Sequence, residues 1–121
     1  MNQIQKFSGF TRDVSVNGDY VFKTPRSING YNANKQEYET WINAGEESRK
    51  FLCPVVSMIM DGSLLVMRRA KCFDSYEELN EVKSDLGYSE DDYDGFTSDL
   101  HRGNFGIYDG RLVLIDYGGH Y

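Results

Sequence analysis

Short runs rich in β-branched, aromatic and aliphatic residues alternate along the chain with three turn-forming dipeptides, Asn17-Gly18, Asp61-Gly62 and Asp109-Gly110. A two-residue type I′ turn needs positive φ at both central positions, and Asn or Asp followed by Gly tolerates this well. We therefore predict three β-hairpins, which join residues 13–16 to 19–23, 55–60 to 63–67 and 105–108 to 112–115. The last strand is continuously apolar, so we expect it to be buried on both faces.

Two segments between the hairpins show helical spacing. Asn34 and Glu37 form a capping-box pattern, which predicts a helix that begins at Asn34, ends at Gly45 and presents Tyr38, Trp41 and Ile42 on one face. A second helix is expected to start at Asp74 and end at Gly87, with an apolar stripe of Tyr76, Leu79, Val82 and Leu86. Residues 87–98 are expected to be loop with one helical turn. Hairpins separated by helices predict an α+β fold with antiparallel pairing.

Length and charge narrow the class of protein. The 121 residues suit one domain, and the net charge of −6 argues against a protein that tracks nucleic-acid phosphates. Residues 1–73 carry a net charge of +3 and residues 74–121 carry −9. The acidic run at 90–94 is typical of a solvated loop, with a cation-collecting rim or a DNA-mimicking patch as alternatives. No run is apolar enough to span a bilayer, the N-terminus does not read as a secretory signal, and the two cysteines fit free thiols, so we expect a cytoplasmic protein without a membrane partner.

The densest cluster of polar residues lies near the C-terminus. Asp99 and Asn104 bracket a Gly-containing loop before the last hairpin, and Asp116 follows that hairpin. Because a hairpin returns its end to its beginning, Asp116 is expected beside Asn104. A carboxylate and an amide oxygen are ligands suited to Mg²⁺, and Asp99 would lie nearby to accept a proton. The alternative is that all three residues only cap turns.

The motifs Asp99-Leu100-His101-Arg102-Gly103-Asn104 and Asp116-Tyr117-Gly118 resemble the catalytic loop and metal-binding motif of the protein kinase-like superfamily. The pattern is most similar to small bacterial or phage kinase-like proteins and to aminoglycoside phosphotransferase-type kinases. The resemblance implies a small lobe over residues 1–70, built from antiparallel hairpins and one helix. A truncated large lobe of helix, catalytic loop and hairpin would follow over residues 71–121.

This resemblance also implies residue roles at an ATP–Mg²⁺ site. Lys23 would hold nucleotide phosphates, and Glu37 (with Glu39 as second choice) would orient Lys23. Met67 would precede the adenine-contacting backbone of Arg68 to Ala70. Asn104 and Asp116 would coordinate Mg²⁺, and Asp99 would accept the proton of the acceptor hydroxyl.

Two departures from the family pattern change the expected function. The phosphate-covering loop holds a single glycine, Gly9, and Arg12 offers a charge there instead. The sequence also ends shortly after Gly118, without the segments that bind a phosphate acceptor, so we expect exposed apolar surface that favours a protein partner or a homo-oligomer.

Three functional hypotheses follow. The first is a minimal kinase-like protein that binds ATP and Mg²⁺ and transfers phosphate to a protein or small-molecule hydroxyl. The alternative is a catalytically degenerate kinase fold, a pseudokinase that acts as a binding module or inhibitor of a partner protein. A third, weaker hypothesis is an acidic decoy for a DNA-binding protein.

Overall fold

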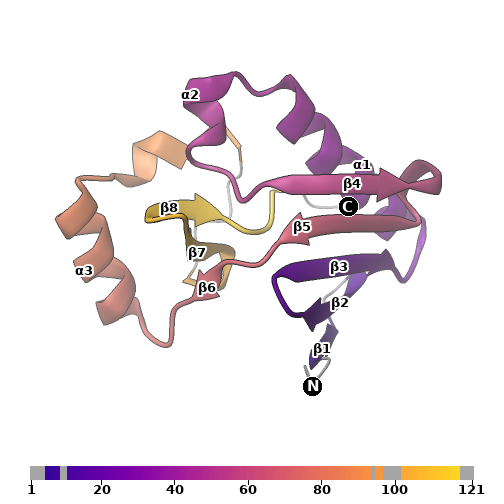
Figure 1. Ribbon diagram of the computed structural model, residues 1–121, viewed down its shortest axis with the longest axis horizontal. Helices are drawn as coiled ribbons and strands as arrows, with labels where there is room; N and C mark the ends of the chain where they lie inside the picture. Colours follow the sequence, from indigo (N-terminus) through magenta and orange to yellow (C-terminus); the bar gives the residue numbers. More distant parts are fainter. Residues whose placement is uncertain (1–4, 9–10, 94, 97–101, 118–121) are drawn as a thin grey trace.

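The computed structural model describes residues 5–8, 11–93, 95–96 and 102–117 (Figure 1). Within these residues, three α-helices and two antiparallel sheets form an α+β fold, which confirms the predicted class. None of the helices in this part of the chain has the length and apolar character needed to cross a bilayer.

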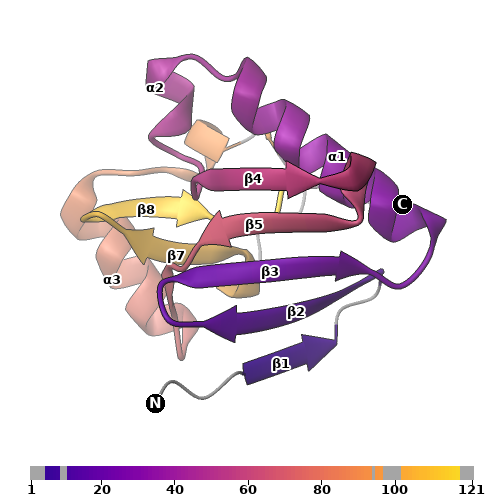
Figure 2. The same cartoon turned by 45° about the vertical axis from the view of Figure 1, so that its right-hand side comes forward.

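The larger sheet contains five strands in the order β1-β2-β3-β5-β4, with every neighbouring pair antiparallel (Figure 2). Its strands are β1 (Gln5–Ser8), β2 (Arg12–Asn17), β3 (Tyr20–Pro25), β4 (Val55–Ile59) and β5 (Leu64–Arg68). The first two predicted hairpins correspond to β2–β3 and β4–β5. The sequence pattern gave no sign of β1.

Helix α1 (Ile28–Asn43) connects β3 to β4 and packs against β3, β4 and β5. The predicted start at Asn34 is wrong, because the helix begins more than one turn earlier, after Ser27. Gly45 does not end it but precedes the short helix α2 (Glu46–Arg49). The capping-box pattern misled because the Asn34 side chain bonds across to other elements instead of to its own helix.

The buried face of α1 also differs from the predicted one. Tyr38 and Trp41 are partly buried against the core, but Ile42 is exposed. The fully buried positions are Gly30, Ala33, Asn34 and Glu37, which are small or polar. At Gly30 a Cβ would lie 2.3 Å from the carbonyl oxygen of Thr11, so only glycine lets the helix approach the backbone before β2 this closely.

The smaller sheet has the strand order β6-β7-β8 and lies beside the end of the larger sheet (Figures 1 and 2). It consists of β6 (Lys71–Cys72), β7 (Phe105–Tyr108) and β8 (Arg111–Leu114). Three short 3₁₀ segments complete the described elements: η1 (Met60–Gly62), η2 (Glu90–Tyr93) and η3 (Arg102–Asn104). Segment η2 supplies the helical turn predicted within residues 87–98.

Helix α3 (Tyr76–Leu86) begins two residues after the predicted start at Asp74. Ser75 is its N-cap, and the Ser75 side chain accepts a hydrogen bond of 3.2 Å from the backbone N–H of Glu78. Gly87 ends the helix with φ of 75°, as predicted. Of the predicted stripe only Leu79 is fully buried, whereas Tyr76 and Leu86 are exposed.

The three predicted turns have different outcomes. Asp109 and Gly110 both have positive φ (53° and 73°) in a two-residue loop, which confirms the type I′ prediction. Asn17 instead pairs with Tyr20 at the end of the ladder, so the loop is Gly18-Asp19, one residue later than predicted.

The turn at Asp61-Gly62 is not a two-residue turn. Ile59 pairs with Leu64, so four residues form the loop between β4 and β5. This loop packs against α1: the carbonyl oxygen of Gly62 accepts a hydrogen bond of 2.8 Å from Asn34 Nδ2. The tertiary contact, rather than the dipeptide alone, sets its conformation.

One cluster of buried apolar residues runs through both sheets and joins them. Leu112, Val113 and Leu114 are completely buried, as predicted for the last strand. The backbone of residues 51–53 pairs with Leu114 through hydrogen bonds of 2.8 Å, from Cys53 N–H to the Leu114 carbonyl and from Leu114 N–H to the Phe51 carbonyl. The last strand is therefore anchored to the segment that leads into β4.

Candidate functional site

Lys23 and Glu37 form a buried ion pair between β3 and α1. The Lys23 ammonium donates a hydrogen bond to Glu37 Oε1, and Glu37 is completely buried. The antiparallel sheet directs the Lys23 side chain toward α1, and the helix presents Glu37 on its sheet-facing side. The predicted contact between these two residues is confirmed, while their role toward a nucleotide stays a prediction.

The Lys23 ammonium also reaches the last hairpin. It donates a hydrogen bond of 2.8 Å to the carbonyl oxygen of Ile115, the residue immediately before Asp116. The N–H of Ile115 in turn donates to the Asn104 carbonyl oxygen over 2.8 Å. The hairpin therefore returns to Asn104 and brings its end to Lys23, as the sequence predicts.

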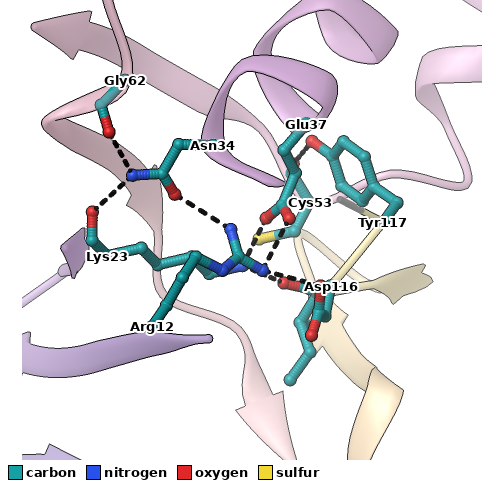
Figure 3. Close-up of polar contacts among 9 residues, drawn as sticks. Arg12, Lys23, Asn34, Glu37, Cys53, Gly62, Asp116 and Tyr117 are labelled. Carbon is teal, nitrogen blue, oxygen red and sulfur yellow. Dashed lines mark hydrogen bonds and ion pairs between the residues drawn. The ribbon is translucent and has the colours of Figure 1, made fainter. Parts of the chain in front are cut away.

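Arg12 on β2 completes this cluster, which we call the Arg12–Lys23 cluster and define as Arg12, Lys23, Asn34, Glu37 and Asp116. Figure 3 shows the Arg12 guanidinium among the other side chains. Its Nη2 lies 2.8 Å from Asp116 Oδ1 and 3.0 Å from Glu37 Oε2. Its Nη1 donates to Asn34 Oδ1 over 3.0 Å. The guanidinium is thus held by three partners, two on α1 and one after the last hairpin.

Asn34 links the cluster to the backbone of β3 and η1. Its Nδ2 donates to the carbonyl oxygens of Lys23 and Gly62 over 3.0 and 2.8 Å, while its Oδ1 accepts from Arg12. A side-chain amide offers donors and an acceptor at once, so it satisfies two carbonyl groups and a guanidinium in a buried position. Asn34 therefore positions Arg12 relative to Lys23.

The charges of the cluster balance. Arg12 and Lys23 contribute two positive charges, and Glu37 and Asp116 contribute two negative charges. Burial lowers the pKa of Arg12, but the adjacent carboxylates of Glu37 and Asp116 more than offset this, so the pKa lies above its ordinary value. The guanidinium is permanently charged in this setting.

The predicted adenine-contacting segment begins in β5. Met67 is buried and pairs with Val21 on β3, two residues before Lys23. The Arg68 N–H donates to the Pro54 carbonyl over 2.9 Å, and the Arg69 N–H donates to the Asp19 carbonyl over 2.8 Å. The backbone N–H groups of Arg68 and Arg69 are therefore occupied within the fold, and the role of this segment toward adenine stays a prediction.

Gly106 on β7 brings Ala70 and Ile115 together. A Cβ at Gly106 would lie 2.8 Å from Ala70 Cβ and 3.2 Å from Ile115 Cγ2. Ile115 also accepts the hydrogen bond from Lys23. Ala70 and the Lys23 ammonium thus lie near the same residue of the last hairpin, Ile115.

The predicted magnesium ligands differ in their surroundings. Asn104 is buried, whereas the Asp116 side chain is 57% exposed and has the Arg12 guanidinium 2.8 Å from its Oδ1. Among the described residues, no three His, Cys, Asp or Glu side chains gather as a metal site. A permanently charged guanidinium on the carboxylate competes with and repels a second cation there. The arrangement around Asp116 does not fit a resident Mg²⁺ ion.

The structure describes some of the other residues of the two C-terminal motifs and not others. Asp99, the predicted proton acceptor, and His101 lie outside the described residues, as does Gly118. Tyr117 is buried, and its hydroxyl donates to the Cys53 carbonyl oxygen over 2.7 Å. Tyr117 therefore anchors the segment after Asp116 to the core.

Sequence reasoning assigned Asn34 to a helix cap and did not foresee that it holds Arg12. A polar residue one helical turn before Glu37, on the same face, was the available signal, because positions three apart on a helix lie side by side. No protein-family model matches the sequence, and no curated protein matches it significantly.

Proposed function

We propose that this chain is a kinase-like nucleotide-binding domain in which Lys23 contacts the phosphates of ATP. The observation that carries the proposal is the position of the Lys23 ammonium, which bridges the Glu37 carboxylate and the carbonyl of Ile115 beside Asp116. The kinase-like motifs imply a lysine oriented by a helix carboxylate and facing the residue that follows the last hairpin. The contacts of Lys23 with Glu37 and with the Ile115 carbonyl support the proposal.

The burial of the cluster supports a functional role for it. Moving charged groups out of water costs several kcal/mol per ion, and well-packed apolar residues are often at least as stabilising. The burial of Arg12, Lys23 and Glu37 together in a small domain therefore favours a binding role for these residues over a purely structural one. Lysine and arginine side chains are the usual protein partners of phosphate groups.

The surroundings of Ala70 support the adenine end of the proposed site. Ala70 follows β5 and packs beside Gly106, next to Ile115. A nucleotide that contacts the backbone at Ala70 and extends along Ile115 reaches the Lys23 ammonium. The base and phosphate contacts then come from segments that the last hairpin holds together.

Phosphate transfer to a protein or small-molecule hydroxyl is the reaction that the motifs imply. Such transfer depends mainly on positioning the reactants and neutralising the phosphate charge. Arg12 and Lys23 supply the positive charge, and Asp99 is assigned to accept the proton of the hydroxyl.

Thermal unfolding with and without ATP tests the proposal. A ligand selective for the folded state stabilises it by about 2.7 kcal/mol at a concentration one hundred times its Kd. We expect millimolar ATP to raise the Tm of the wild type and of Lys50→Met, whose lysine is half-exposed and paired with the exposed Glu47. Lys23→Met should lose the increase, and equilibrium dialysis of labelled ATP at low temperature checks this variant if its Tm falls. An unchanged wild-type Tm with ATP, both in EDTA and with Mg²⁺, contradicts the proposal.

A second candidate function is a kinase-fold binding module without turnover. The contact between Arg12 and Asp116 favours it, because the carboxylate assigned to a metal is already neutralised. Incubation with labelled ATP and a lysate distinguishes the two. ATP binding without transfer or phosphate release favours the module, whereas transfer that Asp99→Asn abolishes favours the enzyme.

A further inference from the structure

The Arg12 guanidinium lies against Asp116, the carboxylate that the motif assigns to a divalent cation. The guanidinium lies within 3.0 Å of both the Asp116 and the Glu37 carboxylates. It is not a surface group that swings freely, since its side chain is only 7% exposed and Asn34 fixes its other nitrogen. Figure 3 shows these contacts converging on one guanidinium.

Arg12 and Lys23 approach this position from neighbouring strands. Val14 pairs with Lys23 and Arg12 pairs with Pro25, so the two cationic residues stand on adjacent, hydrogen-bonded strands. Both side chains contact Glu37, which holds the guanidinium and the ammonium close to one another. A guanidinium beside an ammonium forms a strong site for phosphate oxygens, because arginine offers paired donors and lysine a compact charge.

We infer that the site takes the nucleotide without a divalent cation, with Arg12 supplying the charge that Mg²⁺ would otherwise supply. This inference rests on the proposed function. Its ligand is the uncomplexed nucleoside triphosphate, whose phosphates carry more negative charge than the magnesium complex. Magnesium should therefore compete for the nucleotide in solution and weaken binding to this protein.

The direction in which Asp116→Asn changes the affinity for ATP distinguishes binding through a metal ion from binding through Arg12. If Asp116 holds a metal, Asp116→Asn removes a ligand and weakens ATP binding. If Arg12 takes the place of the metal, Asp116→Asn removes a negative charge beside the phosphates and strengthens binding. Asp116 is more than half exposed, so this variant should fold.

The experiment measures the Tm increase and the Kd for ATP in EDTA and in excess Mg²⁺. We expect the wild type to bind ATP in EDTA and several-fold more weakly with Mg²⁺, and Asp116→Asn to bind several-fold more tightly in EDTA. Arg12→Gln should lose binding in EDTA by at least tenfold. Arg26→Gln, which removes the same charge at a half-exposed position immediately after β3, should bind like the wild type.

The outcomes distinguish this inference from the proposed function. Binding of ATP that requires Mg²⁺ and is weakened in Asp116→Asn overturns the inference and leaves the proposed function standing. No binding of ATP by the wild type in either condition overturns both. If Arg12→Gln does not fold, the Asp116→Asn comparison and the magnesium dependence of the wild type decide the question alone.

Discussion

Lys23 and Ile115 are joined by a hydrogen bond of 2.8 Å from the lysine ammonium to the carbonyl oxygen, although 92 positions separate them in the chain. This bond ties the middle of the larger sheet to the end of the last hairpin. Because Lys23 also pairs with Glu37 on α1, one ammonium connects three segments. Changes at any member of the Arg12–Lys23 cluster should therefore affect both stability and ligand binding.

Replacement of Glu37 by glutamine should be strongly destabilising. The carboxylate is completely buried and contacts both Lys23 and Arg12, so its loss leaves two buried cations and, of the negative charges in the cluster, only the Asp116 carboxylate beside Arg12. Breaking a buried pair by removing one partner costs about 3–5 kcal/mol. Urea denaturation of the wild type and Glu37→Gln measures the difference.

Glu47→Gln is the matched control, because Glu47 pairs with Lys50 over 3.0 Å but its side chain is 88% exposed. Surface changes of this kind stay within about 0.5 kcal/mol. Equal effects of the two substitutions would show that the Glu37 contacts add nothing beyond a surface ion pair.

Asn34→Ala should destabilise the fold and release Arg12. The substitution removes the donors to the carbonyls of Lys23 and Gly62 and the acceptor for Arg12. Each buried group left without its partner costs about 1–3 kcal/mol. Asn43→Ala, at an exposed position of the same helix, should leave the free energy of unfolding nearly unchanged. Similar urea midpoints for both variants would contradict the bridging role of Asn34.

A hairpin was predictable from the sequence where the residues of its turn alone determine the loop. Asp109 and Gly110 adopt positive φ within a tight loop, and no distant contact is needed to explain them. Asp61 and Gly62 also adopt positive φ, but their loop is longer because it packs against α1. The same dipeptide pattern thus gives two different loops, and only tertiary contacts distinguish them.

The candidate site likewise combines contacts that the sequence predicts with contacts that it does not. The Lys23–Glu37 contact was predictable because the resemblance to kinase-like proteins implies such a pair. The burial of Arg12 was not, since its partner Asp116 lies 104 positions away and nothing local marks the pair. Asn34 satisfied a local capping pattern that the fold does not use. A side chain that bonds to distant backbone groups leaves no periodic signal in the sequence.

Gly106→Ala tests whether Ala70 and Ile115 must approach each other closely. The new Cβ would lie 2.8 Å from Ala70 Cβ and 3.1 Å from the Lys71 carbonyl oxygen, so the strands β6 and β7 would have to separate. Overpacking of this kind costs about 1–3 kcal/mol. Thermal unfolding should show a lower Tm, and ATP binding should weaken because Ile115 moves relative to Lys23.

Gly45→Ala is the control for this substitution, because no atom lies within 4 Å of a Cβ at Gly45. It should leave the Tm unchanged or slightly higher. A Tm for Gly106→Ala equal to that of the wild type would mean that β6 and β7 accommodate the methyl group without strain.

The thiol of Cys53 should make stability depend on alkaline pH. Cys53 is buried, its Sγ donates to the Arg68 carbonyl oxygen over 3.1 Å, and burial raises its pKa from 9.0 to about 12. The unfolded chain therefore releases this proton at lower pH than the folded chain. The contribution to stability is complete below about pH 9 and is lost as the pH rises toward about 12.

Urea denaturation below pH 9 and at steps between pH 9 and 12 measures this loss. The free energy of unfolding of Cys53→Ala should fall less steeply over this range than that of the wild type, whatever its value at neutral pH. Burial also raises the pKa values of Tyr93 and Tyr117, so both proteins keep a tyrosine contribution and only the difference between them reports on Cys53. Cys72→Ala should follow the wild type, because Cys72 is exposed. Parallel pH profiles for the wild type and Cys53→Ala would show that the Cys53 thiol titrates alike in the folded and unfolded chain.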